Sequence, residues 1–143
     1  MKDLRNELEA QRRDQAIAEA ASLAAGAVDG VVVERRDGLT NEDLKRLAVA
    51  TRDVLGSGIV GLVGVAPDGE KAAVVVAVSR DLVETGVVAG SIAADAARVL
   101  GGGTGRQPDV AVGGGPDATA VEEARALLEQ HAKEAAGAPP SPR

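Results

Sequence analysis

Glycine supplies the first chemical signal in this sequence. Seven of the eighteen glycines fall within residues 101–115, in the clusters Gly101-Gly102-Gly103-Thr104-Gly105-Arg106 and Gly113-Gly114-Gly115. Ordering glycine costs more backbone entropy than ordering any other residue, so such a concentration indicates positive φ angles or close approach of the backbone to another surface. The first cluster follows an apolar run over 91–100 that predicts a helix. Glycines there can end the helix and expose successive N–H groups to an anion, but they also fit a helix cap and loop without a ligand.

No catalytic or metal-binding arrangement accompanies these glycines. There is no cysteine, and His131 is the only imidazole, near the end of a predicted terminal helix where a half-packed structural role is expected. The serine of Ser79-Arg80-Asp81 lacks a base to activate it. Carboxylates that could act as acids, bases or metal ligands show no diagnostic spacing; they are Asp81, Asp95, Asp109 and Asp117. The glycine run is not a nucleotide-binding P-loop, because no Gly-Lys-Ser/Thr follows it. We therefore expect no enzyme activity, no cofactor and no metal.

Composition sets further bounds. The chain of 143 residues is 45% hydrophobic without any aromatic residue, so its core must be built from Val, Leu, Ile and Ala. A net charge of −6 and a pI near 4.8 argue against a broad, sequence-blind nucleic-acid surface, although they allow a local basic patch. No apolar run approaches the roughly 20 residues of a membrane span, and the N-terminus is not a signal peptide. We expect a cytoplasmic location and no membrane partner.

The remaining pattern predicts an α/β domain. Residues 2–25 have a strong helix composition, and 28–36 indicate a strand. Thr40 and Asp43 then suggest a capped helix. Its charged side chains, Lys45, Arg46 and Arg52, are expected to be solvated surface charges. Two β-branched runs, 59–66 and 71–78, flank the turn residues 67–70 and predict a hairpin covered on both faces. A helix ending at 100, a short strand at 109–112 and a helix opened by a capping box at Thr119 complete the order.

We expect three segments. Residues 1–26 form a long N-terminal helix, 27–136 a globular glycine-rich domain with helices packed on a mixed β-sheet, and 137–143 a disordered tail. The helix fits either an ordinary element folded onto the domain or a spacer or dimerisation helix. Because it begins at Met1 without a capping sequence, we expect the chain to be part of a longer protein.

The ordered series of motifs resembles the C-terminal domain of alanyl-tRNA synthetases, a module shared with the accessory domain of DHH-type phosphoesterases. The resemblance spans roughly residues 27–135 and rests on 76–82, 88–90, 101–109, 110–115 and the helix from Thr119 to Lys133. Those phosphoesterase domains commonly carry histidine after three glycines, where this chain has Thr104. Relative to the synthetase pattern, Thr104 replaces a glycine, Gln107 is inserted and Val112 replaces a polar residue.

The resemblance implies a non-catalytic module that binds alanine-specific tRNA at the outer corner of its L shape and assists aminoacylation and editing. Because no aromatic residue can stack on bases, contact would come from loop amides and arginines. The predicted RNA-binding residues are Gly101, Gly102, Gly103, Thr104, Gly105, Arg106, Arg80 and Arg98. Two alternatives stay open. One is an interaction module that forms a homodimer through the N-terminal helix, with little RNA affinity, as the acidic pI suggests. The other is a phosphoesterase accessory domain that binds oligonucleotide ends.

Overall fold

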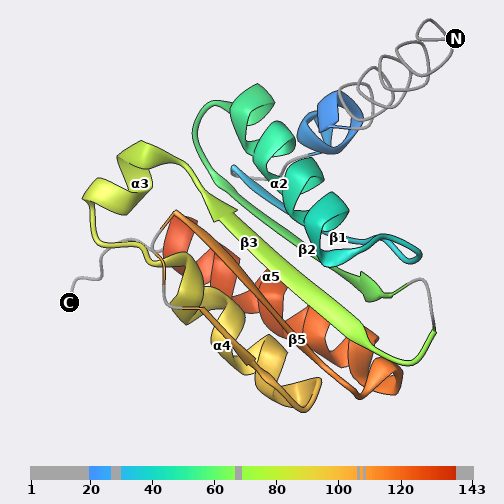
Figure 1. Ribbon diagram of the computed structural model, residues 1–143. Coiled ribbons are helices and arrows are strands. Elements are labelled where there is room, and N and C mark those ends of the chain that lie inside the picture. Colours follow the sequence, from blue (N-terminus) through green and yellow to red (C-terminus); the bar gives the residue numbers. More distant parts are fainter. Residues whose placement is uncertain (1–19, 27–29, 67–68, 106, 108, 138–143) are drawn as a thin grey trace, which may run out of the picture.

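The computed structural model describes residues 20–26, 30–66, 69–105, 107 and 109–137 (Figure 1). Residues 20–25 are helical and Gly26 is in a turn, whereas residues 1–19 of the predicted N-terminal helix lie outside the described residues. Of the predicted tail, Gly137 instead belongs to the last helix, and residues 138–143 lie outside the described residues. The elements that follow are, in chain order, β1 (Val31–Arg35), α2 (Asn41–Leu55), β2 (Ile59–Val65), β3 (Ala72–Val78), α3 (Arg80–Glu84), α4 (Ala89–Val99), β4 (Gly103–Thr104), β5 (Val110–Gly115), the 3-10 turn η1 (Ala118–Ala120) and α5 (Val121–Gly137).

Five strands form one mixed sheet in the order β1-β2-β3-β5-β4. β1 is parallel to β2, whereas the other neighbours are antiparallel. The predicted hairpin is the central pair, with Ile59 opposite Val78 and Val65 opposite Ala72. This confirms the predicted α/β class and the mixed sheet.

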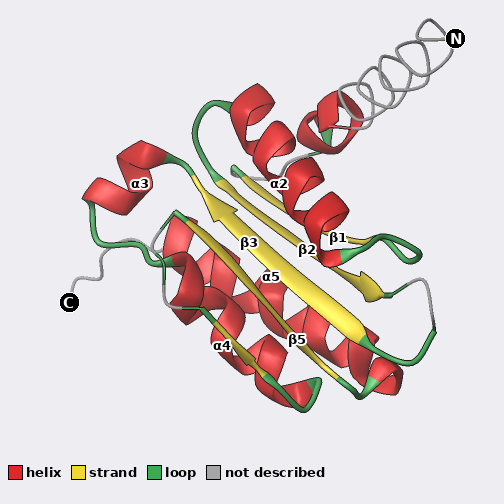
Figure 2. Cartoon of the chain, in the orientation of Figure 1, coloured by secondary structure: helices red, strands yellow, loops and turns green. Residues whose placement is uncertain are grey.

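Helices cover both faces of the sheet (Figure 2). α4 and α5 pack on one face, while α2 and the helical segment 20–25 pack on the other. Alternation along β3 shows why its sequence is continuously apolar: Val74 and Val76 belong to the α4–α5 side, and Val75 belongs to the α2 side. The buried apolar side chains on both faces of the sheet are Val, Ala, Leu and Ile, as the composition requires.

Side-chain caps begin two of the helical elements. The Thr40 side chain accepts a hydrogen bond from the Asp43 amide and caps α2 as predicted. The predicted capping box at Thr119 is wrong, because Thr119 lies inside η1 and its amide donates to Asp117, which is the capping residue. Two short elements, α3 and β4, were not predicted, since neither is long enough to show a periodic pattern. Among the described residues, no helix is long and apolar enough to cross a membrane.

Candidate functional site

The first glycine cluster ends α4 and then forms the edge of the sheet; residues 101–105 are called here the glycine segment. Gly101 has φ 91°, and its amide donates to Arg98 O at 2.9 Å while that of Gly102 donates to Ala97 O at 3.0 Å. This pair of bonds is the Schellman arrangement that closes a helix at its C-terminus. The Gly105 amide donates to Val112 O at 3.3 Å. The expectation that loop amides lie free for an anion is therefore wrong for these three groups.

Close backbone approach explains part of the glycine concentration. A Cβ on Gly102 would lie 1.8 Å from Gly114 O, and one on Gly115 would lie 2.2 Å from Leu100 O. By contrast, a Cβ on Gly103 or Gly105 would meet nothing within 4 Å. The cluster thus contains glycines required by packing and glycines whose surface is open. Gly101, Gly102, Gly103 and Gly105 are all exposed, so the segment is an outer surface of the protein.

Thr104 differs from its neighbours in the segment. It is half-buried and lies opposite Gly113 in the β4–β5 pair. Its hydroxyl oxygen is buried and has no hydrogen-bond partner among the described residues. The side chain at this position therefore faces the protein more than the solvent.

The structure separates the predicted arginines. Arg98 belongs to the last turn of α4 beside the glycine segment; its side chain is 78% exposed and lies 3.4 Å from Asp95. Arg80 follows β3 at the other end of the sheet. Gly103 pairs with Gly114, which pairs with Ala73. Arg80 is seven residues beyond Ala73 along the chain, which corresponds to at most about 23 Å along the strand direction at roughly 3.3 Å per residue. Arg106 lies outside the described residues.

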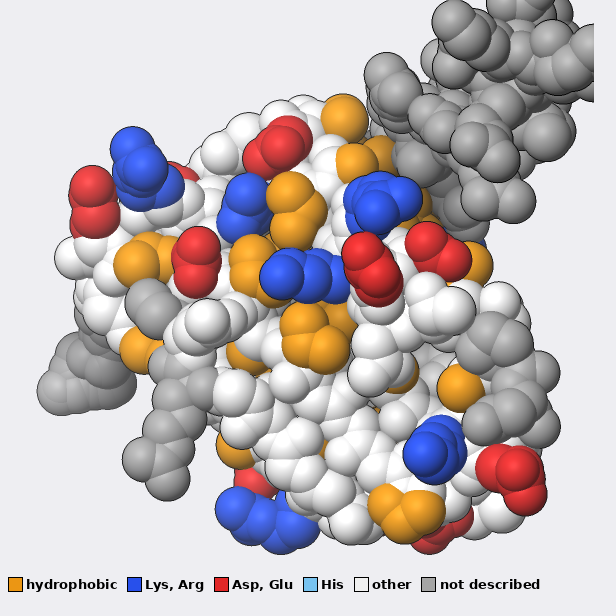
Figure 3. Space-filling view, in the orientation of Figure 1, with side chains coloured by type: hydrophobic (Ala, Val, Ile, Leu, Met, Phe, Trp, Pro, Cys, Tyr) orange, Lys and Arg blue, Asp and Glu red, His pale blue; other side chains and the backbone are white. Residues whose placement is uncertain are grey.

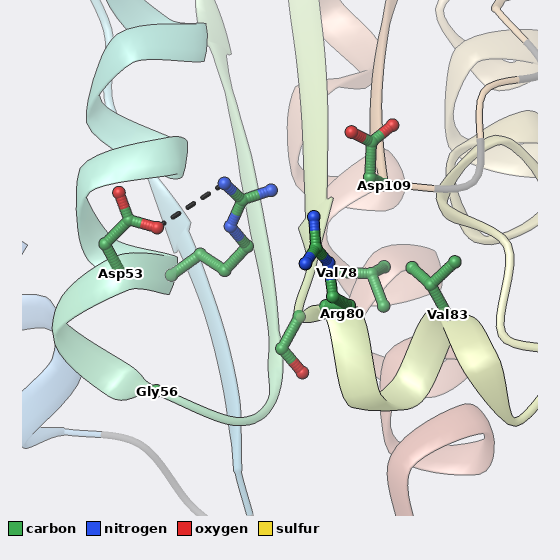
Figure 4. Close-up of a pocket in the computed structure, with 8 residues that line it drawn as sticks. Asp53, Gly56, Val78, Arg80, Val83 and Asp109 are labelled. Carbon is green, nitrogen blue, oxygen red and sulfur yellow. Dashed lines mark hydrogen bonds and ion pairs between the residues drawn. The ribbon is translucent and has the colours of Figure 1, made fainter.

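Arg80 instead faces a hollow at the far end of β3 (Figure 4). The hollow, about 730 Å³ in volume, lies between the last turn of α2, the β3–α3 junction and the start of β5. Its lining residues are Arg52, Asp53, Gly56, Val78, Ser79, Arg80, Val83 and Asp109. The prediction of a solvated surface charge is wrong for Arg52, whose side chain is only 21% exposed. Sequence reasoning missed this site because its residues are spread over three elements.

A hydroxyl–carboxylate cluster holds one wall of the hollow in place. Asp81 accepts hydrogen bonds from Ser57 Oγ at 2.6 Å and Ser79 Oγ at 2.5 Å, and Ser79 Oγ accepts one from the Gly58 amide at 3.0 Å. The bonds from Ser57 and then Ser79 lower the pKa of Asp81 below its ordinary value, although burial opposes them. Both hydroxyls are committed to a carboxylate, so the cluster ties the loop after α2 to α3.

The carboxylates considered for chemistry serve separate local contacts. Asp95 links α4 to α5, with Oδ2 3.0 Å from Nε2 of His131, whose side chain is 30% exposed, the half-packed position expected. Asp109 Oδ1 accepts a hydrogen bond from the Val110 amide, and Asp117 caps η1. Within the part of the chain that the structure describes, no three metal-ligating side chains cluster.

Charge on the α2 face is local and mixed. Figure 3 shows Lys and Arg side chains interspersed with apolar and acidic ones, without a broad basic surface. This agrees with the net charge of −6. On this face an anionic partner would be held at a few defined positions.

Comparison with known proteins identifies the family to which this fold belongs. The family model described as the DHHA1 domain matches residues 28–134, which include the sheet, the hollow and the glycine segment. The chain belongs to the DHHA1 domain family. This DHHA1 domain is similar to the C-Ala domain from Aquifex aeolicus alanyl-tRNA synthetase, a crystal structure it matches with a TM-score of 0.62 and 26% identity, covering 71% of this chain and 89% of that one.

Curated relatives of this DHHA1 domain are much longer proteins. It is 40% identical over 132 residues to the alanine–tRNA ligase of Thermobifida fusca, a match that covers 87% of this chain and 15% of the ligase. It is 43% identical over 116 residues to that of Leifsonia xyli, covering 81% and 13%. The chain therefore spans about 15% of the length of such relatives. The resemblance inferred from the glycine motifs is confirmed.

Proposed function

We propose that this DHHA1 domain is the non-catalytic, tRNA-binding C-terminal domain of a cytoplasmic alanyl-tRNA synthetase. In this role it contacts the outer corner of alanine tRNA and assists aminoacylation and editing, which other domains perform. The proposal rests chiefly on the likeness to alanine–tRNA ligases and to a C-Ala domain across the whole glycine-motif region. Residues 27–136 form the binding module, and 1–26 connect it to the rest of the protein.

The glycine segment supplies a physical basis for RNA contact. Because Gly103 and Gly105 are exposed and have open space where a side chain would be, a sugar–phosphate backbone can approach the main chain closely there. Arg98 stands next to this surface with a weak, exposed ion pair to Asp95 that a phosphate can replace. Arg106, Thr104, Gly101 and Gly102 belong to the same proposed contact. Recognition then depends on the shape of the folded RNA more than on net charge.

A comparison of two RNAs tests this proposal. The full chain is titrated against fluorescently labelled alanine tRNA and against an acceptor–T-arm minihelix that lacks the corner, over a series of KCl concentrations. We expect tighter binding to intact tRNA, with an affinity that falls as salt rises. Equal affinity for both RNAs, or no binding to either at low salt, contradicts the proposal.

The acidic charge favours a second candidate, an interaction module that pairs two copies through the N-terminal helix. Sedimentation of the full chain is compared with that of a chain lacking residues 1–18. This cut retains Ala20 and Leu23, which are buried against α2 and the sheet, so the domain keeps its core. A concentration-independent monomer in the full chain excludes the dimer. A dimer that the truncation dissociates supports it.

A further inference from the structure

Two guanidinium groups from different elements face the hollow at the end of β3. Arg52 comes from the last turn of α2 and Arg80 from the first turn of α3 (Figure 4). Arg80 is exposed and has no ion pair or side-chain hydrogen bond with any described residue. Arg52 lies 3.4 Å from Asp53, its neighbour in sequence, whose side chain is 67% exposed. Nη2 of Arg52 donates a hydrogen bond to Asp53 at this distance, but the bond is long and its carboxylate is exposed, so it contributes little and a phosphate can compete for the guanidinium.

Asp109 adds a hydrogen-bond acceptor to the same hollow. Its Oδ1 accepts a hydrogen bond from the Val110 amide at 2.9 Å, which fixes the carboxylate at the start of β5. Oδ2 has no hydrogen-bond partner among the described residues. Arg80 lines the same hollow (Figure 4) and forms no ion pair with this carboxylate. A carboxylate that lines the same hollow as two arginines, with no ion pair to either among the described residues, suits a ligand that carries both an anion and a hydrogen-bond donor.

We propose that this hollow holds one ribonucleotide of the bound RNA. Its phosphate lies between Arg52 and Arg80, and its ribose 2′-hydroxyl donates a hydrogen bond to Asp109 Oδ2. A ribonucleotide presents a phosphate and a hydroxyl at neighbouring positions, and guanidinium and carboxylate groups are suited to each. Val78, Val83 and Gly56 add apolar surface to the lining, and Asp53 and Ser79 are its remaining polar residues. The proposal rests on the RNA-binding function and extends it to residues outside the glycine motifs.

The hollow also enlarges the expected RNA footprint. It lies at most about 23 Å from the glycine segment along the strand direction, as the register of β3, β5 and β4 requires. A folded tRNA is large enough to reach both places, whereas a single free nucleotide is not. We therefore expect the two contacts to contribute separately to the affinity for intact tRNA.

Single substitutions in the full chain test the arginines. R52Q and R80Q remove one guanidinium each. R46Q is the matched control, because Arg46 lies on the same helix with a 69% exposed side chain, pairs with Glu42 at 3.7 Å and does not line the hollow. We expect R52Q and R80Q to weaken binding of alanine tRNA by roughly tenfold, as for the loss of one charge-assisted hydrogen bond. Each should also reduce the slope of log affinity against log salt by about one. R46Q should change the affinity by less than about twofold.

D109N tests the hydroxyl contact. The side-chain oxygen of asparagine still accepts from the Val110 amide, but the amide NH2 then occupies the position of Oδ2 and cannot accept a hydroxyl proton. We expect D109N to weaken RNA binding even though it removes a negative charge, and to narrow the preference for tRNA over a DNA copy of the same sequence. Thermal unfolding of each variant checks that the fold is kept.

The outcomes distinguish a failure of the proposed RNA-binding function from a failure of the hollow as an RNA site. If the unmodified chain does not bind intact tRNA, the proposed function itself fails. If that chain binds but R52Q and R80Q match R46Q in affinity and salt slope, the hollow is not an RNA site and only the present inference fails. If D109N binds RNA more tightly, or keeps the same RNA-to-DNA preference, the ribose contact is overturned.

Discussion

Replacing Gly102 by alanine should lower the melting temperature of the domain much more than replacing Gly103 by alanine. A Cβ on Gly102 would lie 1.8 Å from Gly114 O, whereas ordinary contact begins at 3.4 Å, so the two backbones must separate by about 1.6 Å. That separation breaks the β4–β5 pairing and strains the end of α4. Overpacking of this kind costs about 1–3 kcal/mol, and each lost backbone hydrogen bond adds about 1 kcal/mol. We expect a total destabilisation of about 2–4 kcal/mol.

Gly103 is the matched control within the same cluster. It lies one residue away, has no atom within 4 Å of a built Cβ and does not have a positive φ angle. Alanine there restricts the unfolded chain more than the folded one, which stabilises a protein by about 0.4–1 kcal/mol. For a domain of about 110 residues, 1 kcal/mol moves Tm by roughly 4–5 °C. We therefore expect G102A to lower Tm by roughly 10–20 °C and G103A to leave it unchanged or slightly raised.

Far-ultraviolet circular dichroism during heating measures both changes, and urea unfolding checks that a single transition remains. If G102A melts within about 2 °C of G103A, the two backbones do not approach as closely as described, and the packing explanation of the cluster is refuted. The same pair has a functional use. Because G103A keeps the fold, its affinity for alanine tRNA reports whether a methyl group on the open surface obstructs the RNA.

Three further predictions concern stability. Leu128→Ala removes a side chain that is fully buried between α5 and the sheet and should cost about 2–5 kcal/mol in urea unfolding, whereas Val54→Ala, at 51% exposure, should stay within about 0.5 kcal/mol. Thr40→Ala removes the cap of α2 and should cost about 0.5–2 kcal/mol by the same measurement, with no change for Thr85→Ser at an exposed turn. Because the pKa of Asp81 is lowered in the folded protein, its carboxylate stabilises the fold at neutral pH, and this stabilisation is lost as the pH falls below about 4. The melting temperature should therefore decrease less between pH 7 and pH 3 for D81N than for the unmodified chain.

Much of the fold could be predicted because its signals are local. The β-branched runs 59–66 and 71–78 became β2 and β3, and the apolar face beginning at Leu44 became the buried side of α2. The glycine after the predicted helix at 91–100 does end α4. The prediction failed where two residues compete for one role. Asp117 caps η1, and Thr119 lies inside this 3-10 turn, so the last helix begins at Val121 and Thr119 does not cap it.

The candidate site was predicted less well. The composition revealed the glycine cluster. It did not reveal that the amides of Gly101, Gly102 and Gly105 donate to backbone carbonyls, because these bonds depend on how α4 ends and where β4 pairs. Arg80 was named for its neighbourhood in a motif and lies at the opposite end of the sheet from the glycines. The sequence predicted Arg52 as one of three solvated surface charges on a helix. Only its position against β3 and Asp109 places it in the hollow.

The sequence by itself determined the long helices and strands, the absence of aromatic residues from the core and the family, because apolar periodicity, β-branched runs and ordered motifs are properties of neighbouring residues. The tertiary structure decided which glycines are required by packing, which remain open and which arginines face a common space. Those properties depend on strand register and helix placement, which bring together residues 20 or more positions apart, such as Gly58 and Ser79. Spacing along the chain does not encode such distances, so the hollow with Arg52, Arg80 and Asp109 emerges only once β3, β5 and α2 are assembled.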